Sequence, residues 1–199
     1  MSSPFETFRP EDVRDLIAAY PLAWVSVGGE GVDEPTLLPM IGEYDADGAL
    51  TGLIGHLARR NPLCAAMRQA GRARFLFCGP QAYVSPSQAG RRDWAPTWNF
   101  ASLRIEAEVT LDDDHTRPAI DALAVLVEAG RDDPWSAEEL GPRYAQLSGA
   151  IIGFRARVLT LRGVFKLGQD ERAETFASIV ERHPDADLVT WMRRFDARR

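Results

Sequence analysis

Two adjacent arginines stand where a predicted strand gives way to a predicted helix, in the stretch GHLARRNP. Arg59 and Arg60 carry fixed positive charge and bidentate hydrogen-bond donors, which suit a phosphate group. Asn61 can cap the following helix, whose unpaired N-terminal amides and dipole also favour an anion. A solvated basic pair in front of a capped helix is the alternative explanation. The stretch is therefore a candidate phosphate site.

An aromatic side chain lies between two polar ones in the stretch PTWNF. Thr97 and Asn99 offer polar tips beside the flat ring of Trp98. A conjugated ring with amide-like edges would use this combination, stacking on one face and hydrogen-bonding at its rim. Alternatively, Trp98 fills a barrel core while Asn99 caps a bulge. Either way, a buried Asn99 needs hydrogen-bond partners.

Two more stretches carry polar groups at predicted turns or strand ends. In YVSPS, the hydroxyls of Ser85 and Ser87 can line a polar ligand or simply close a turn. VFKLGQ contains Gln169 and Lys166, which is the only lysine of the sequence. An ammonium and a guanidinium fit different sites, so a lone lysine among arginines is either a selected feature or chance.

Signatures of protein-based catalysis are missing. The sequence has no GxSxG, HExxH, P-loop or GxGxxG stretch. The three histidines are far apart, and Cys64 and Cys78 have no metal-like spacing, so no metal site is predicted. Any reaction chemistry is then expected from a bound cofactor, and no catalytic residue is assigned.

Composition indicates an ordinary soluble protein. The 199 residues are 45% hydrophobic and 26% charged, and no segment reads as a signal peptide or membrane span, so a cytoplasmic location is expected. The net charge of −6 disfavours direct nucleic-acid binding. The arginines from Arg193 to Arg199 are the only weak candidate for such a surface.

The hydrophobic pattern predicts a mainly β protein with helices, built as an antiparallel β-barrel. We expect one domain over residues 1–199, with helical segments at 114–147 and a helical C-terminal tail at 170–199 broken near Pro184. The predicted helices are 10–20, 116–128, one from Asn61 and one capped by Ser136 and Glu139; the predicted strands are 23–27, 35–44, 49–56, 73–79, 98–111 and 151–168. A turn is predicted at 28–34.

Four stretches in this order resemble the PaiB-like family of FMN-binding negative transcriptional regulators: GHLARRNP, GPQAYVSPS, PTWNF and IIGFRARVLTLRGVFKLGQ. The likeness covers roughly residues 4–176. It implies the split-barrel fold of flavin reductases and pyridoxamine-phosphate-oxidase-like proteins, with FMN bound at a homodimer interface. The cofactor-binding residues that it implies are His56, Arg59, Arg60, Asn61, Ser85, Ser87, Thr97, Trp98, Asn99, Lys166 and Gln169.

The chain departs from the family pattern at five positions. Leu37 replaces a usual histidine, and Gln88 replaces an aromatic residue. The family's KLSQNR is KLGQDE here, which removes a hydroxyl at Gly168 and adds the carboxylates of Asp170 and Glu171. Carboxylates near a phosphate repel it, so FMN binding is predicted to be weakened, altered or lost.

The resemblance favours a homodimeric FMN-binding regulator, with any catalysis being flavin-mediated redox chemistry fed by a reduced nicotinamide donor. Two alternatives stay open. One is a repressor that binds DNA directly without a cofactor. The other is a split barrel that binds haem or another flat cofactor, for which His56 is the one histidine within a recognised stretch.

Overall fold

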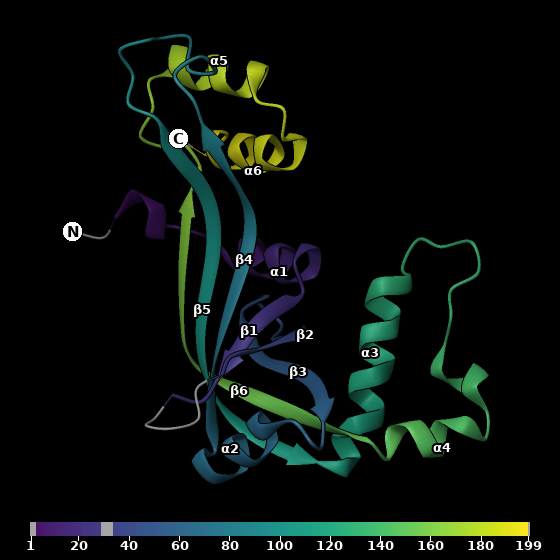
Figure 1. Cartoon of the computed structure of the whole chain (residues 1–199). Coiled ribbons are helices and arrows are strands. Elements are labelled where there is room, and N and C mark those ends of the chain that lie inside the picture. Colours follow the sequence, from purple (N-terminus) through teal and green to yellow (C-terminus); the bar gives the residue numbers. More distant parts are fainter. Residues whose placement is uncertain (1–2, 29–33, 199) are drawn as a thin grey trace. The chain divides into compact units, whose positions relative to one another are not determined.

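Six antiparallel strands form a closed barrel in the order β1-β2-β3-β6-β5-β4 (Figure 1). The computed structural model describes residues 3–28 and 34–198, so most of the turn predicted at 28–34 lies outside the described residues. The strands are β1 (Leu22–Ser26), β2 (Thr36–Tyr44), β3 (Leu50–Ala58), β4 (Arg72–Val84), β5 (Thr97–Asp112) and β6 (Ile151–Lys166). The predicted barrel is confirmed.

The chain divides into two compact units. One unit, here called the barrel unit, comprises residues 9–77 and 104–161. The other, the tail unit, comprises residues 1–8, 78–103 and 162–199. The strands β4, β5 and β6 are each shared between the two units.

Alternating side chains build the core of the barrel unit. In β4 the sequence ARFLF places Ala73, Phe75 and Phe77 inside. The ring of Phe75 stacks on that of Phe154 in β6, with centroids 6.3 Å apart. Period-2 alternation puts every second residue of a strand on one face, so these apolar residues share the interior.

Two helices flank the strands of this unit. Helix α1 (Pro10–Ala19) buries Val13, Leu16 and Ile17. Helix α2 (Pro62–Ala70) begins after Asn61, whose side chain accepts the Leu63 amide as predicted for an N-cap. It ends at Gly71, which has a φ of 64°.

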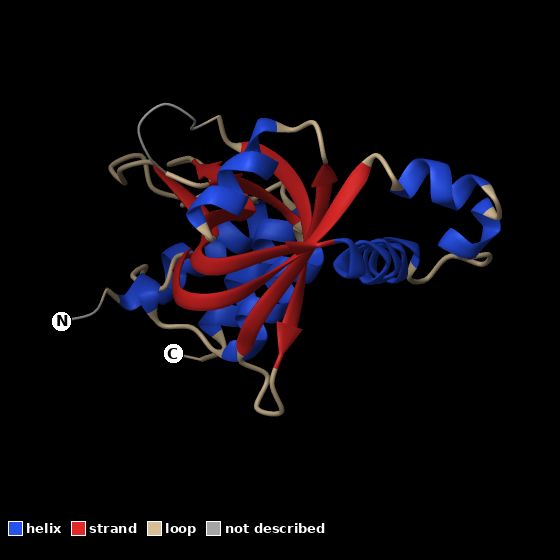
Figure 2. Ribbon diagram, turned by 90° about the horizontal axis from the view of Figure 1, so that it is seen from below, coloured by secondary structure: helices blue, strands red, loops and turns tan. Residues whose placement is uncertain are grey.

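A helical annex projects from the strands of the barrel unit in both views (Figures 1 and 2). It contains η2 (Asp113–His115), α3 (Thr116–Glu128), η3 (Ala137–Leu140) and α4 (Arg143–Ser148). The predicted capping box is confirmed, since the Ser136 amide donates to Glu139 Oε1 at 2.8 Å. The helix nevertheless ends after one 3-10 turn, because Gly141 takes a φ of 50° and a proline follows it.

The tail unit packs two helices around aromatic rings. These are α5 (Ala173–Arg182) and α6 (Ala186–Asp196), separated near Pro184 as predicted; η1 (Pro4–Glu6) also belongs to this unit. The ring of Phe165 stacks on Phe195 at 5.0 Å and on Trp191 at 6.2 Å. No helix in the described part of the chain is both long and apolar enough to cross a bilayer.

Candidate functional site

The two arginines of the strand-to-helix corner have different environments. Arg59 donates from Nε to the carbonyl oxygen of Gly149 at 3.1 Å, and its guanidinium forms an ion pair with Asp113. Arg60 is exposed, and no residue of the described ranges forms an ion pair or side-chain hydrogen bond with it. Arg60 is therefore the guanidinium that remains available to an anion.

The prediction of unpaired amides at the start of α2 is wrong. The Asn61 amide donates to the Ala58 carbonyl and the Cys64 amide to the Asn61 carbonyl, both at 2.9 Å. The Leu63 amide donates to Asn61 Oδ1 at 2.9 Å, and Pro62 has no amide hydrogen. An anion at this corner would thus interact with Arg60 and the helix dipole rather than with free amides.

His56 lies on β3 opposite Gly153 of β6. Its side chain lines a cavity formed with α3 and α4. Burial lowers the pKa of His56 below its ordinary value of 6.5, so the imidazole is neutral at pH 7. The apolar surroundings of His56 differ from the charged surroundings of Arg59.

Trp98 lies at the surface of the tail unit, so the alternative that it fills the barrel core is wrong. It is 51% exposed, its Nε1 donates to Gln81 Oε1 at 2.7 Å, and its ring lies 6.1 Å from that of Tyr83. Next to it, the Thr97 hydroxyl accepts a hydrogen bond from Lys166 Nζ. Trp98 thus offers an exposed aromatic surface, whereas the Lys166 cation lies with Thr97 on the other phase of β5.

The side chain of Asn99 lies on the opposite face of β5 from that of Trp98. It is 2% exposed, and its amide nitrogen donates to Met192 Sδ at 3.7 Å. Because alternate residues of a strand face opposite sides, an exposed Trp98 implies a buried Asn99. The structure therefore places Trp98 and Asn99 on different faces of β5.

The other polar residues of the tail unit form local turns. Ser85 and Ser87 share a hydroxyl contact of 2.7 Å, and the Ser85 amide donates to Gln88 Oε1 at 2.8 Å. Gln169 Oε1 accepts the Leu167 amide at 2.7 Å. Of the two readings of Ser85 and Ser87, the geometry supports a closed turn.

Two of the departures from the family pattern have structural explanations. Gly168 takes a φ of 86°, a conformation that favours glycine over serine. Glu171 accepts a hydrogen bond from Trp94 Nε1 at 3.2 Å. The sequence alone indicated only a lost hydroxyl group at Gly168 and an added carboxylate at Glu171.

An exposed apolar surface on the barrel unit was missed by sequence reasoning. Trp24 of β1 lies opposite Leu37 of β2 and opposite Leu76 of β4 in the strand register. These three and Leu22 are all at least 39% exposed. We call the four residues the β1 patch. A tryptophan on the outward phase of LAWVS was the signal that could have revealed it.

Comparison with known proteins agrees with this fold. Residues 1–160 match the sequence model of a family described as "Putative FMN-binding domain". The protease synthase and sporulation protein PAI 2 of Bacillus subtilis is 26% identical over 132 residues, covering 65% of this chain and 63% of that protein. The chain thus spans less than two thirds of the length of the curated relatives it matches.

Two solved structures share the fold. The flavocytochrome Anf3 from Azotobacter vinelandii aligns with a TM-score of 0.62 and 16% identity, covering 86% of this chain and 74% of that one. The FAD and heme binding protein from Mycobacterium smegmatis aligns with a TM-score of 0.57 and 17% identity, covering 86% and 78%. The split-barrel fold and the resemblance carried by the four stretches are confirmed. Since the family model spans 160 of 199 residues, the chain belongs to the family of FMN-binding domains.

Proposed function

We propose that this chain binds FMN with the phosphate at the corner between β3 and α2. FMN is the cofactor of the family. The observation that carries the placement is Arg60, an exposed guanidinium without a partner in the described ranges, at the N-terminal end of a capped helix. Its bidentate donors and the helix dipole fit a dianionic phosphate. Arg59, already paired with Asp113, would hold the corner in shape.

FMN, when bound, would supply the chemistry of hydride and electron transfer. The residues of the chain bind and orient the cofactor. Taken by itself, Trp98 of the tail unit is a candidate surface for stacking of a flat ring. Its support is the exposed face of the indole.

We further propose that the protein is a homodimer that pairs through the β1 patch. Four exposed apolar side chains on neighbouring strands are typical of an interaction surface. The patch also borders the proposed phosphate corner. Asn61 Nδ2 donates to Thr36 Oγ1 at 3.4 Å, and Leu37 of the patch is the next residue. A dimer formed here would place the cofactor beside the partner, as the resemblance implies.

The regulatory role implied by the resemblance is proposed to be indirect. A net charge of −6 opposes direct attraction to DNA, so we place the effect in the small-molecule chemistry of the flavin. A gel-shift assay with promoter DNA tests this proposal. Salt-dependent retention of DNA by the cofactor-free protein would contradict it.

The binding proposal is tested by titrating FMN into cofactor-free protein and following quenching of flavin fluorescence. Arg60→Gln should weaken binding about tenfold, because it removes a charge-assisted hydrogen bond. Arg68→Gln is the matched control, since it removes the same charge from the last turn of the same helix. Equal loss in both variants would refute the placement. Absence of binding by the unaltered protein would refute FMN binding itself.

Haem stays a prediction for this chain. Two of the structures that share its fold are named a flavocytochrome and an FAD and heme binding protein. The visible spectrum of the purified protein separates the two cofactors, because haem gives a Soret band and FMN does not.

A further inference from the structure

A cavity of about 400 Å³ lies between the annex and the barrel strands of the barrel unit. Helix α3 contributes an apolar stripe, and β3, β6, η3 and α4 complete the walls. The stripe consists of Ile120, Leu123, Ala124 and Val127. This volume falls in the range that holds small organic ligands. The lining residues that matter below are His56, Leu123, Val127, Trp135, Tyr144 and Ser148.

None of the described residues that line this cavity carries a charged side chain, and four of them bear polar groups: His56, Trp135, Tyr144 and Ser148. The Ser148 hydroxyl donates to the Ala145 carbonyl at 3.4 Å. The His56 imidazole has no hydrogen-bond partner among residues 3–28 and 34–198. Since its burial favours the neutral form, it offers one N–H donor and one bare nitrogen acceptor. The phenol of Tyr144 adds a second polar tip.

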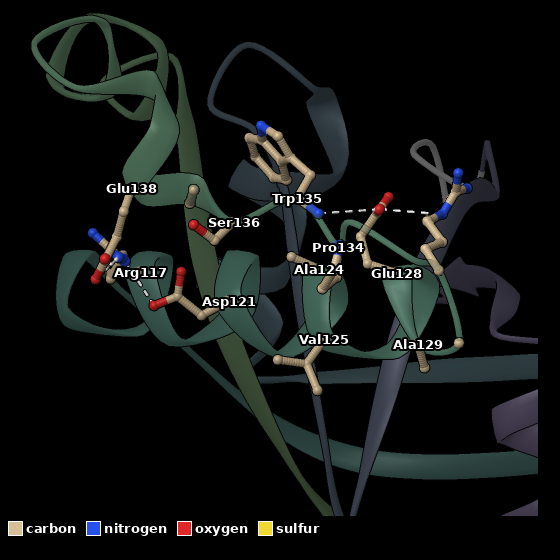
Figure 3. A pocket seen from close by; sticks show the side chains of 13 residues that line it. Arg117, Asp121, Ala124, Val125, Glu128, Ala129, Pro134, Trp135, Ser136 and Glu138 are labelled. Atoms are coloured by element: carbon tan, nitrogen blue, oxygen red, sulfur yellow. Dashed lines mark hydrogen bonds and ion pairs between the residues drawn. The ribbon is translucent and has the colours of Figure 1, made fainter.

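The groove on the other side of α3 is different in character (Figure 3). Its charged side chains pair with one another: Arg117 Nε lies 2.6 Å from Asp121 Oδ2, and Arg131 lies 3.1 Å from Glu128. Glu128 also accepts the Trp135 amide at 3.2 Å, which fixes the loop after α3. The charges that line this groove therefore pair within the annex, whereas the described residues that line the cavity with His56 carry no charge.

We propose that this cavity binds a neutral aromatic molecule of one or two rings that carries a hydroxyl group. The rings would contact the aliphatic stripe of α3 and the aromatic side chains of Trp135 and Tyr144. The hydroxyl group would hydrogen-bond with the His56 imidazole, which has no hydrogen-bond partner among the described residues. The absence of lining charges among the described residues opposes phosphates and carboxylates, which would be buried without a counter-charge. The site is separate from Arg60 and does not depend on FMN binding.

The test uses the full chain and two probes in isothermal titration calorimetry, 2-naphthol and naphthalene. They share the rings and differ by the hydroxyl group. We expect 2-naphthol to bind more tightly. His56→Leu should weaken 2-naphthol about tenfold and leave naphthalene unchanged, because only the hydrogen bond is lost. Equal effects on both probes, or no binding of either, would overturn the proposal.

A second pair of variants tests the location. Val127→Trp should fill the cavity and abolish binding of both probes, since Val127 lines it and is half-exposed. Val125→Trp is the matched control: Val125 is on the same helix, is 74% exposed and lines the opposite groove. Loss of binding in both variants, or in neither, would overturn the assignment. Repeating the titration with saturating FMN separates this proposal from the flavin site, because competition would assign the cavity to FMN.

Discussion

Replacing Gly153 with alanine should separate the annex from the barrel strands. Gly153 lies in β6, where the backbone of His115 and Thr116 crosses it at the start of α3. A Cβ built at Gly153 would lie within 3.0 Å of three backbone atoms of these two residues, closer than real Cβ contacts. Backbone cannot rotate aside as a side chain can, so the start of α3 must move.

The size of the effect follows from two contributions. Carbon atoms pack at about 3.5–4.0 Å, so the backbone at His115 must retreat by roughly an ångström, and overpacking of this kind costs about 1–3 kcal/mol. The same movement breaks the buried hydrogen bond from the Gly153 amide to Thr116 Oγ1, which is 2.9 Å long. An unsatisfied buried donor costs about 1–3 kcal/mol. We expect Gly153→Ala to lower the free energy of unfolding by about 3 kcal/mol.

Urea unfolding followed by circular dichroism measures this loss. Gly149→Ala is the control, because Gly149 has a helical φ of −60° and a Cβ there would meet its nearest atom at 3.4 Å. This control should be as stable as the unaltered protein or about 0.5 kcal/mol more stable. A free energy of unfolding for Gly153→Ala within about 0.5 kcal/mol of the unaltered protein would refute the argument from close approach.

Three further predictions follow from single side chains. Trp24→Ser should convert the proposed dimer to a monomer in analytical ultracentrifugation. Val125→Ser, which removes an exposed apolar side chain outside the β1 patch, should not. Lowering the pH through 6.5 should reduce the free energy of unfolding of the unaltered protein relative to that of His56→Leu, as measured by urea unfolding. The reason is that the folded state keeps His56 neutral while the unfolded state takes up a proton. Parallel pH profiles of the two proteins would contradict the burial of His56. Burial raises the pKa of Tyr44 to about 12, so Tyr44 stays protonated at a pH just above 10.0. Tyr44→Phe should therefore have the same phenolate absorbance as the unaltered protein at that pH, and a lower absorbance would contradict the raised pKa.

Local sequence signals predicted the elements well. Period-2 alternation gave the strands, and capping residues gave the helix starts at Asn61 and Ser136. These signals act between residues a few positions apart, where chain geometry alone fixes the contacts. The short length of η3 was not predicted, because Gly141 takes a positive φ that only the surrounding structure selects.

The candidate site was predicted less well, because it depends on which side each residue faces. The stretch PTWNF has polar or aromatic candidates for ligand contact on both phases of a strand. Only packing against Met192 decides that Asn99 faces inward and Trp98 outward. Arg59 and Arg60 look equivalent in the sequence. Asp113, 54 positions away, pairs with the first and leaves the second available.

The sequence by itself determined the secondary structure, the barrel and the family of this protein, since those follow from near-neighbour patterns and from stretches of fixed order. The tertiary structure decided which polar groups form hydrogen bonds or ion pairs within the described part of the chain and which do not. It also decided that the apolar stripe of α3 lines a cavity beside His56 rather than a filled core. Both depend on partners that are remote in the chain, and no local pattern encodes them.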